Sequence, residues 1–183
     1  AVGDGAFSNN FLRSVTIPSS VTSIGSTAFY ECTNLIYAVI QGAKSIGYSA
    51  FHGCTNLANI FLPNSLTSIQ DRAFKDCTSL ISVIIPEGVT NISNHAFAYC
   101  TNLTTINIPK GVTYIGGYAF DSCEKLTDID IPESVTFIGE WAFGTCINLK
   151  TVNIQGVPIF EKSVFKNCEN LTTINIPKGV ENI

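Results

Sequence analysis

Residues 100–122, CTNLTTINIPKGVTYIGGYAFDS, are followed directly by residues 123–145, CEKLTDIDIPESVTFIGEWAFGT. Each stretch has 23 residues, and the two share cysteine, leucine, isoleucine, proline, valine and phenylalanine at the same places. The common pattern is C-x-x-L-x-x-I-x-I-P-x-x-V-x-x-I-G-x-x-A-F-x-x. Recurrence at a fixed interval of about 20–50 residues indicates a repeat protein, in which each unit buries its apolar face against its neighbours.

The same unit extends over the whole chain. Its cysteines lie 22 or 23 residues apart, at Cys32, Cys54, Cys77, Cys100, Cys123, Cys146 and Cys168. Leucine and phenylalanine columns keep the same phase from Phe7 to Leu171, so we expect one domain of about eight units over residues 1–183. The chain has no methionine and starts and stops in the same phase of the unit. We therefore expect a piece of a longer array, whose uncapped ends can associate end to end.

Each unit predicts one short strand and one compact turn. Apolar and polar residues alternate in LTTINIP, residues 103–109, and Pro109 ends the strand because proline cannot donate to a ladder. The A-F-x-x-C stretch is too short for a full helix, so we expect a turn of α- or 3₁₀-helix there. The glycine before it, such as Gly116, predicts a bend with positive φ. The predicted fold is an α/β repeat solenoid with a parallel sheet on one face and short helical turns opposite.

This unit resembles the BspA-like leucine-rich repeat, also called the Treponema pallidum type, over essentially the whole chain. The resemblance implies a curved, right-handed superhelix. Members are typically surface or secreted proteins of anaerobic bacteria and some parasitic protists, and they are associated with adhesion. The resemblance therefore implies an extracellular or cell-surface location and a host or microbial surface protein as partner. The family has no common catalytic residues to carry over.

Composition and spacing argue against several classes of function. The formal net charge of −4 argues against nucleic acid or an anionic membrane as partner. No run of 18 apolar residues is present, so we expect no membrane insertion. His52 and His95 lie at different phases of the unit without a recurring Ser, Cys or Asp partner, so we expect no catalytic triad and no enzyme. The sequence contains no phosphate-binding loop, and we expect no cofactor.

The seven cysteines are expected to be interior residues. Zinc ligands usually lie about two to four residues apart, whereas no two cysteines here are closer than 22 residues. All copies point the same way, which disfavours the crossed geometry of a disulfide. We expect a buried ladder of reduced thiols that pack as small apolar groups, with no metal site.

Three asparagines stand in N-x-S/T sequons, which carry glycans in eukaryotic secreted proteins: Asn91, Asn102 and Asn170. The T-N-L-T sequence arises from the repeat itself, so both readings stay open.

Outward strand positions are the first candidate binding surface. Residues between the buried columns alternate to the outer face, and the second to fourth units place Tyr37, Val39, Phe61 and Ile84 there. Contiguous exposed apolar residues mark interaction sites, so we predict a protein-binding patch. The alternative is that these residues favour strands for packing reasons and that neighbouring side chains cover them.

Asp128 and Asp130 point outward from one later strand, and we place them as an acidic patch beside the apolar one. They could instead help to hold a cation, supply general acid or base chemistry, or form a plain solvated strand face.

His95, Tyr118 and Trp141, at variable positions before A-F, form a second candidate surface. An exposed tryptophan often anchors an interface, although Trp141 could equally lie flat over the next coil. With the resemblance, these features predict an extracellular scaffold for protein–protein binding or adhesion. The alternative is a structural spacer that displays another domain and has no ligand of its own.

Overall fold

The computed structural model describes residues 1–156 and 158–180, which form fifteen short β-strands and no helix. The odd-numbered strands are β1 (Ser14–Ile17), β3 (Tyr37–Ile40), β5 (Asn59–Phe61), β7 (Ser82–Val83), β9 (Thr105–Ile106), β11 (Asp128–Ile131), β13 (Thr151–Ile154) and β15 (Thr173–Asn175). The even-numbered strands are β2 (Ser23–Ile24), β4 (Ser45–Ile46), β6 (Ser68–Ile69), β8 (Asn91–Ile92), β10 (Tyr114–Ile115), β12 (Phe137–Ile138) and β14 (Ile159–Phe160).

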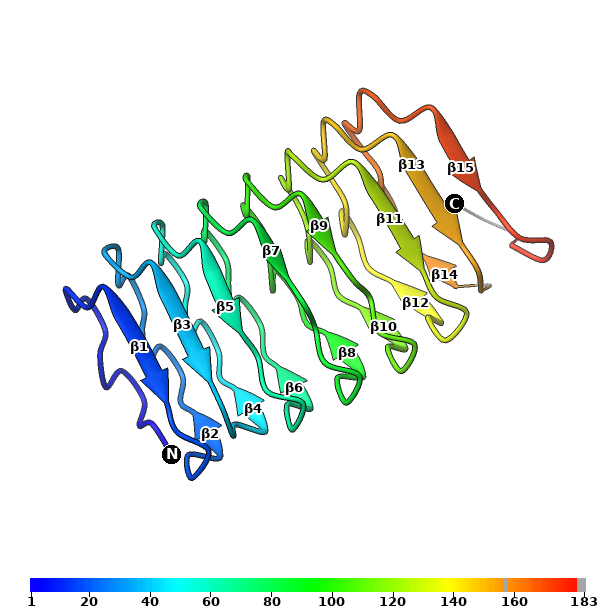
Figure 1. Cartoon of the computed structure of the whole chain (residues 1–183). Coiled ribbons are helices and arrows are strands. Elements are labelled where there is room, and N and C mark those ends of the chain that lie inside the picture. Colours follow the sequence, from blue (N-terminus) through cyan, green and yellow to red (C-terminus); the bar gives the residue numbers. More distant parts are fainter. Residues whose placement is uncertain (157, 181–183) are drawn as a thin grey trace.

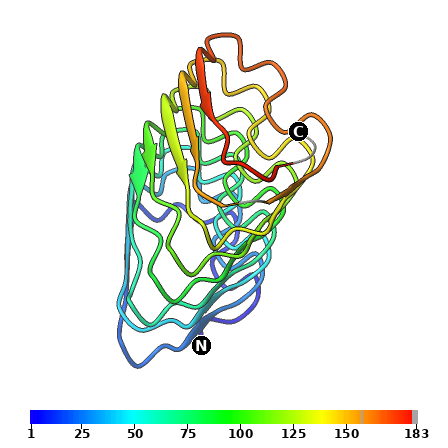
Figure 2. The same ribbon diagram turned by 90° about the vertical axis from the view of Figure 1, so that its right-hand side faces the viewer.

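Successive units stack as coils of one solenoid, and all paired strands are parallel (Figure 1). Figure 2 shows the odd-numbered strands gathered along one side of the coil. The even-numbered strands form one seven-stranded sheet from β2 to β14. The odd-numbered strands form a five-stranded sheet from β1 to β9 and a three-stranded sheet from β11 to β15. The parallel sheet expected from the sequence is therefore present, with a break between β9 and β11.

Phenylalanine rings stack through the interior, one from each unit. Neighbouring rings from Phe7 to Phe165 have centroids 4.9–5.6 Å apart and planes within 14° of parallel. The rings from Phe29 to Phe143 have no exposed surface, and the leucine column from Leu35 to Leu149 is equally buried. Each stacked pair contributes about 0.5–1.5 kcal/mol beyond its area burial. The interior columns predicted from the repeat are confirmed.

The cysteines also occupy the interior, and each thiol donates a hydrogen bond to a phenylalanine carbonyl in the turn of the neighbouring coil on the N-terminal side. The distances run from 2.9 Å, for Cys32 to Phe7, to 3.4 Å, for Cys123 to Phe97. All seven are free thiols, and only Cys168 is partly exposed. Burial raises the pKa of every one of these thiols. The pKa is about 11 at Cys168, and the fully buried thiols such as Cys100 have a larger shift. The predicted ladder of buried thiols is confirmed, and the hydrogen bonds are an addition.

The A-F-x-x-C stretch is not a helical turn, which corrects the expectation from the sequence. For example, the N–H of Phe97 donates to the carbonyl of Ala119 in the next unit (2.8 Å). The N–H of Ala98 donates to the carbonyl of His95 within the same turn (3.2 Å). This alternation stacks the turns through main-chain hydrogen bonds. Two positions per unit, four residues apart, have positive φ and therefore interrupt a right-handed helix: Gly5, Asn9, Thr27, Glu31, Ser49, Gly53, Arg72, Asp76, His95, Tyr99, Tyr118, Ser122, Trp141, Thr145, Ser163 and Asn167.

The glycine column of I-G-x-x-A-F does not have the positive φ that was predicted for it. The left-handed residue stands two positions later, as Tyr118 does after Gly116. Glycine is preferred because adjacent units approach closely at some copies: a Cβ on Gly116 would lie 2.6 Å from the main-chain nitrogen of Asn94. Gln70, Ser93 and Glu161 occupy the same column in other units, so glycine is not required throughout. On Gly3, in the first unit, an added Cβ would meet nothing within 4 Å.

Candidate functional sites on the strand face and the turn face

The outward side chains of the odd-numbered strands form one surface, the strand face. Tyr37, Phe61 and Ile84 are 45%, 60% and 79% exposed, and Val39 is half-buried. Val39 on β3 lies opposite Phe61 on β5. Phe61 and Ile84 line a hollow of about 310 Å³ that also includes Leu62 and Pro86. The structure therefore brings the four predicted residues together, with Tyr37 and Val39 on β3, Phe61 on β5 and Ile84 directly after β7, and only Val39 is substantially covered.

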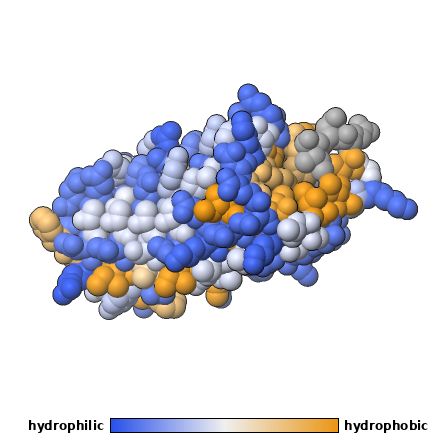
Figure 3. Space-filling model, turned by 90° about the horizontal axis from the view of Figure 1, so that it is seen from above, coloured by the Kyte–Doolittle hydropathy of each residue, from blue (hydrophilic) through white to orange (hydrophobic). Residues whose placement is uncertain are grey.

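The apolar surface extends further than the sequence analysis placed it. Ile36 and Ile81 stand directly after the recurring leucine and are 42% and 49% exposed, and Phe11 near the N-terminus is 82% exposed. In the view from above, orange groups line the strand-face edge of the N-terminal half (Figure 3). Ile36 and Ile81 could have been found by comparing the residue that follows the recurring leucine, which is Ala58, Thr104 or Lys150 in other units. We call Ile36, Tyr37, Val39, Phe61, Ile81 and Ile84 the strand-face patch.

Asp128 and Asp130 are exposed on β11, but β9 separates them from the strand-face patch. Asn107, directly after β9, accepts a hydrogen bond from the N–H of Ile85 (2.8 Å) and donates one to the carbonyl of the same residue (3.0 Å). Asp130 accepts a hydrogen bond from the amide of Asn153 (2.7 Å), and Asn153 accepts one from Asn175. The acidic pair therefore heads a ladder of amides in the three-stranded sheet and is not continuous with the apolar residues.

The variable residues of the stacked turns form a second surface, the turn face. His95, Tyr118 and Trp141 form a continuous stack there, with centroids 4.9 Å and 6.1 Å apart and near-parallel rings. The ammonium group of Lys166 lies 5.0 Å from the Trp141 ring, whose atoms also approach Gly144. All three stacked residues are half-buried. Trp141 thus lies against its neighbouring coils, as the packing alternative described.

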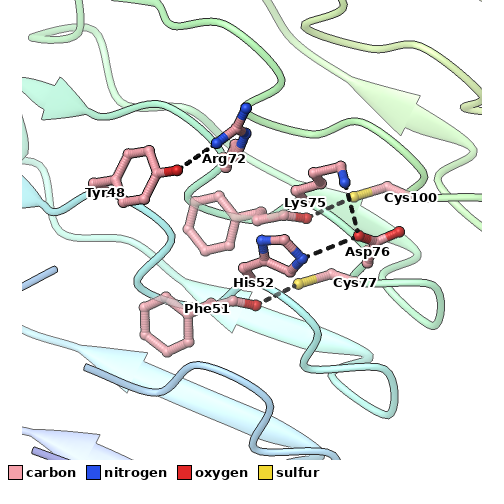
Figure 4. A network of polar contacts seen from close by, with 9 residues as sticks. Tyr48, Phe51, His52, Arg72, Lys75, Asp76, Cys77 and Cys100 are labelled. Carbon is pink, nitrogen blue, oxygen red and sulfur yellow. Dashed lines mark hydrogen bonds and ion pairs between the residues drawn. The ribbon is translucent and has the colours of Figure 1, made fainter. Parts of the chain in front are cut away.

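A hollow of about 490 Å³ opens on the turn face, across the turns of five consecutive units. It is lined by Thr27, Tyr30, Tyr48, Ser49, His52, Arg72, Lys75, His95, Tyr99, Tyr118 and Asp121. Figure 4 shows two polar groups at this place. Arg72 donates to the hydroxyl of Tyr48, and Asp76 lies 3.2 Å from His52 and 3.3 Å from Lys75.

Sequence reasoning missed most of this hollow, including Tyr48, Arg72, Lys75 and the pairing of His52 with Asp76. Each residue stands in a variable column next to A-F, but the residues belong to different units and meet only when the turns stack. A comparison of those columns for charged and aromatic residues in adjacent units would have indicated the place.

Burial sets the protonation of the hollow's histidines. Desolvation lowers the pKa of His52 against the opposing attraction of Asp76, and it also lowers the pKa of His95. Both imidazoles are therefore neutral at pH 7. Desolvation raises the pKa of the Asp121 carboxyl, which is only 6% exposed.

In the part of the chain that the structure describes, no three His, Cys, Asp or Glu side chains gather as a metal site would require. No helix within that part is long and apolar enough to cross a membrane.

Two of the three sequon asparagines have a structural role. The amides of Asn102 and Asn170 donate to the carbonyls of Thr78 and Ile147 in preceding units, each at 2.7 Å. Asn56 and Asn148, which have no sequon, make the same bond. These asparagines therefore recur because they join neighbouring units, and Asn91 on β8 is exposed.

Comparisons with known proteins agree with this architecture. The sequence profile "BspA type Leucine rich repeat region (6 copies)" matches residues 1–104 and again residues 90–183. The crystal structure of a Treponema pallidum leucine-rich repeat protein is similar, with 30% identity and a TM-score of 0.81, covering 87% of this chain and 78% of that one. A Bacteroides ovatus leucine-rich repeat protein has 31% identity and a TM-score of 0.85 over 90% of this chain, which spans only 45% of that protein. No curated protein sequence matches the chain.

Proposed function

The chain belongs to the BspA-type leucine-rich repeat family, and on this premise we propose that it is a cell-surface or secreted adhesion scaffold that binds a protein partner through its strand face. Leucine-rich repeats of this family are generally protein-binding, non-enzymatic scaffolds. The surface location and the adhesive role rest on the family resemblance. The strand-face patch supplies the binding site, because the buried columns of phenylalanine, leucine and cysteine are fixed by packing and only the outward columns can vary.

One observation carries the proposal: Phe61 on β5 and Ile84, directly after β7, are 60% and 79% exposed and line one hollow. Large apolar side chains that stay in contact with water raise the free energy of a folded domain. Contiguous patches of such side chains therefore mark interaction sites. Aromatic residues at the centre of an interface commonly supply most of its binding energy.

Binding of the labelled chain to epithelial cells and to bacterial cells, measured by flow cytometry, tests the proposal. We expect the unchanged chain to bind a protease-sensitive receptor, and the double variant Phe61→Ser/Ile84→Ser to bind at least about tenfold more weakly, because each large apolar contact contributes about 1.5–3 kcal/mol. The matched control is Ile159→Ser, which removes an apolar side chain that is 67% exposed on β14.

Equal binding by the double variant and the chain would overturn the assignment of the strand face. If the chain binds neither cell type, it is a structural spacer. A separate double variant, Asp128→Asn/Asp130→Asn, tests the acidic residues. It should bind as the unchanged chain does if the partner contacts only the apolar residues, and more weakly if the contact extends across β9.

A further inference from the structure

The hollow on the turn face lies outside the surface that the adhesion proposal uses. Its volume of about 490 Å³ falls within the range of small-ligand pockets. It is lined by side chains from several consecutive units, so a ligand there would contact a surface that forms only when the turns stack.

Arg72 is the charged group that lacks a partner in this hollow. Within residues 1–156 and 158–180 no carboxylate lies within 4.0 Å of its guanidinium, whereas Lys75 is paired with Asp76 at 3.3 Å. A guanidinium carries five N–H donors. Within the described residues, the Arg72 side chain donates a hydrogen bond to the hydroxyl of Tyr48. The Cζ atom of Arg72 also lies 5.7 Å from the centroid of the Tyr48 ring. Arg72 is half-buried and lines the hollow, so its other N–H donors are available to a ligand in a partly desolvated space.

The charges around Arg72, which include the carboxylates of Asp71 and Asp121, favour a ligand with no more than one negative charge. His52 and His95 are neutral at pH 7, because burial lowers the pKa of each. Asp76 neutralises Lys75, and the nearby carboxylate of Asp121 is buried. The formal charge of the whole chain is −4, which repels polyanions. A ligand with a single carboxylate suits this balance better than a phosphate dianion, a nucleic acid or a strongly acidic peptide.

The remaining lining carries hydroxyls and imidazoles beside aromatic rings. Tyr30, Tyr48, Tyr99, Tyr118 and Ser49 contribute hydroxyl groups to the lining. Hydroxyls and neutral imidazoles both donate and accept hydrogen bonds. Sugar rings present the same mixture, with several hydroxyls around an apolar C–H face that packs on aromatic surfaces.

Arg72 occupies this place at a conformational cost. Its φ is +58°, in the left-handed region where a residue with a Cβ costs roughly 1–2 kcal/mol and glycine costs almost none. The equivalent positions in the first two units hold Gly5 and Thr27. The backbone of the turn therefore does not require an arginine, so the reason for this side chain lies in what it contacts.

We infer that the turn-face hollow binds a carboxylate-bearing sugar, such as a uronic acid or a sialic acid residue of a glycan. The guanidinium of Arg72 pairs with the carboxylate through two parallel N–H···O bonds, the geometry that arginine favours. The Tyr48 ring and hydroxyl hold the guanidinium in position, while the tyrosine hydroxyls and His95 meet the hydroxyls of the sugar.

Isothermal titration of the chain with methyl glucuronide and with methyl N-acetylneuraminide tests this site and distinguishes the two sugar classes. Methyl glucoside is the neutral match, and acetate and inorganic phosphate are the simple anions. We expect millimolar or tighter binding of at least one acidic sugar. The neutral sugar and both simple anions should bind at least about tenfold more weakly, because a hydrogen-bonded charge contact contributes about 1.5–3 kcal/mol. The fluorescence of Trp141, the single tryptophan, gives a second readout, since its ring stacks on Tyr118 of the hollow.

The decisive variant is Arg72→Asn, because asparagine tolerates positive φ and the fold should remain intact in circular dichroism. We expect this variant to lose at least about tenfold in affinity, and Arg72→Lys to lose less. Arg13→Asn, which removes an exposed arginine just before β1, is the matched control and should bind as the unchanged chain does.

Three results would overturn the inference. The first is no binding of either acidic sugar at millimolar concentration. The second is equal binding of methyl glucoside, acetate or phosphate, which would leave a general polyol or anion site. The third is unchanged affinity in Arg72→Asn. None of these results bears on the strand face, so the adhesion proposal stands or falls separately.

Discussion

The Sγ atom of Cys77 lies 3.2 Å from the carbonyl oxygen of Phe51, in the turn of the neighbouring coil on the N-terminal side. The same relationship joins every cysteine of the chain to a phenylalanine 25 or 26 residues earlier. The sulfur therefore fills interior volume and also donates to a main-chain carbonyl. This double role makes the thiol a link between units.

Replacement of one buried cysteine tests that link. Cys77→Ala removes a fully buried sulfur and its hydrogen bond, so we expect the free energy of unfolding to fall by about 1–2 kcal/mol. The measurement is urea denaturation followed by far-ultraviolet circular dichroism. Cys168→Ala is the control, because Cys168 is only partly buried and should cost less than half as much. Equal losses at the two sites would contradict a role that depends on burial.

Alkaline pH should destabilise the fold. The thiol pKa is raised above its ordinary value of 9.0 throughout the ladder, to about 11 at Cys168. The folded pKa exceeds the unfolded one, so the stabilising contribution is complete below the ordinary thiol pKa and is lost as the pH rises above it. Each thiol can then remove up to about 1.4 kcal/mol per pH unit. We expect the urea midpoint to drop steadily from pH 8 to pH 11, and a constant midpoint would show that the thiols ionise freely in the folded state.

Where glycine stands against the preceding unit, an added methyl group should destabilise the fold, whereas at Gly3 it should not. Gly116→Ala places a Cβ 2.6 Å from the nitrogen of Asn94, and we expect a loss of about 1–3 kcal/mol from the forced backbone shift. Gly3→Ala meets nothing within 4 Å and should cost nothing. Thermal unfolding of the two variants, compared with the unchanged chain, gives the answer. A similar loss at both positions would mean that backbone entropy, and not the close approach, explains the column.

Glycine should stabilise the left-handed positions of the turns. Thr145 is β-branched and has a φ of +53°, so Thr145→Gly removes a strain of roughly 1–2 kcal/mol and adds about 0.5–1 kcal/mol of unfolded-chain entropy. We expect a net gain of up to about 1 kcal/mol in denaturant titration. The control is Thr90→Gly, an exposed residue without positive φ, which should lose about 0.5–1 kcal/mol.

The parts of this fold that repeat could be predicted from the sequence, and the parts that join different units could not. The columns of Leu103 and Phe120 recur in every copy, so their burial follows from the period. The turn conformation escaped prediction because Arg72, His95 and Trp141 are poor markers of positive φ. Glycine, the usual marker, stands two residues before the left-handed position in some units, as Gly139 does before Trp141, and it stands there for a different reason.

The candidate sites divide in the same way. The exposure of Phe61 and Ile84 followed from strand alternation within single units. The contact of His52 with Asp76 and the placing of Arg72 beside Tyr48 depend on which residues of neighbouring turns come into register, and no pattern inside one unit contains that information.

Most bonds between neighbouring turns run from main chain to main chain, or between residues that recur in nearly every copy, such as cysteine and phenylalanine. A coil can therefore be duplicated or deleted by unequal recombination and still find the same bonding groups above and below it. The gene can lengthen or shorten the rod in whole steps, while single-base changes alter the outward columns one at a time. Length and recognition can thus evolve separately in this protein.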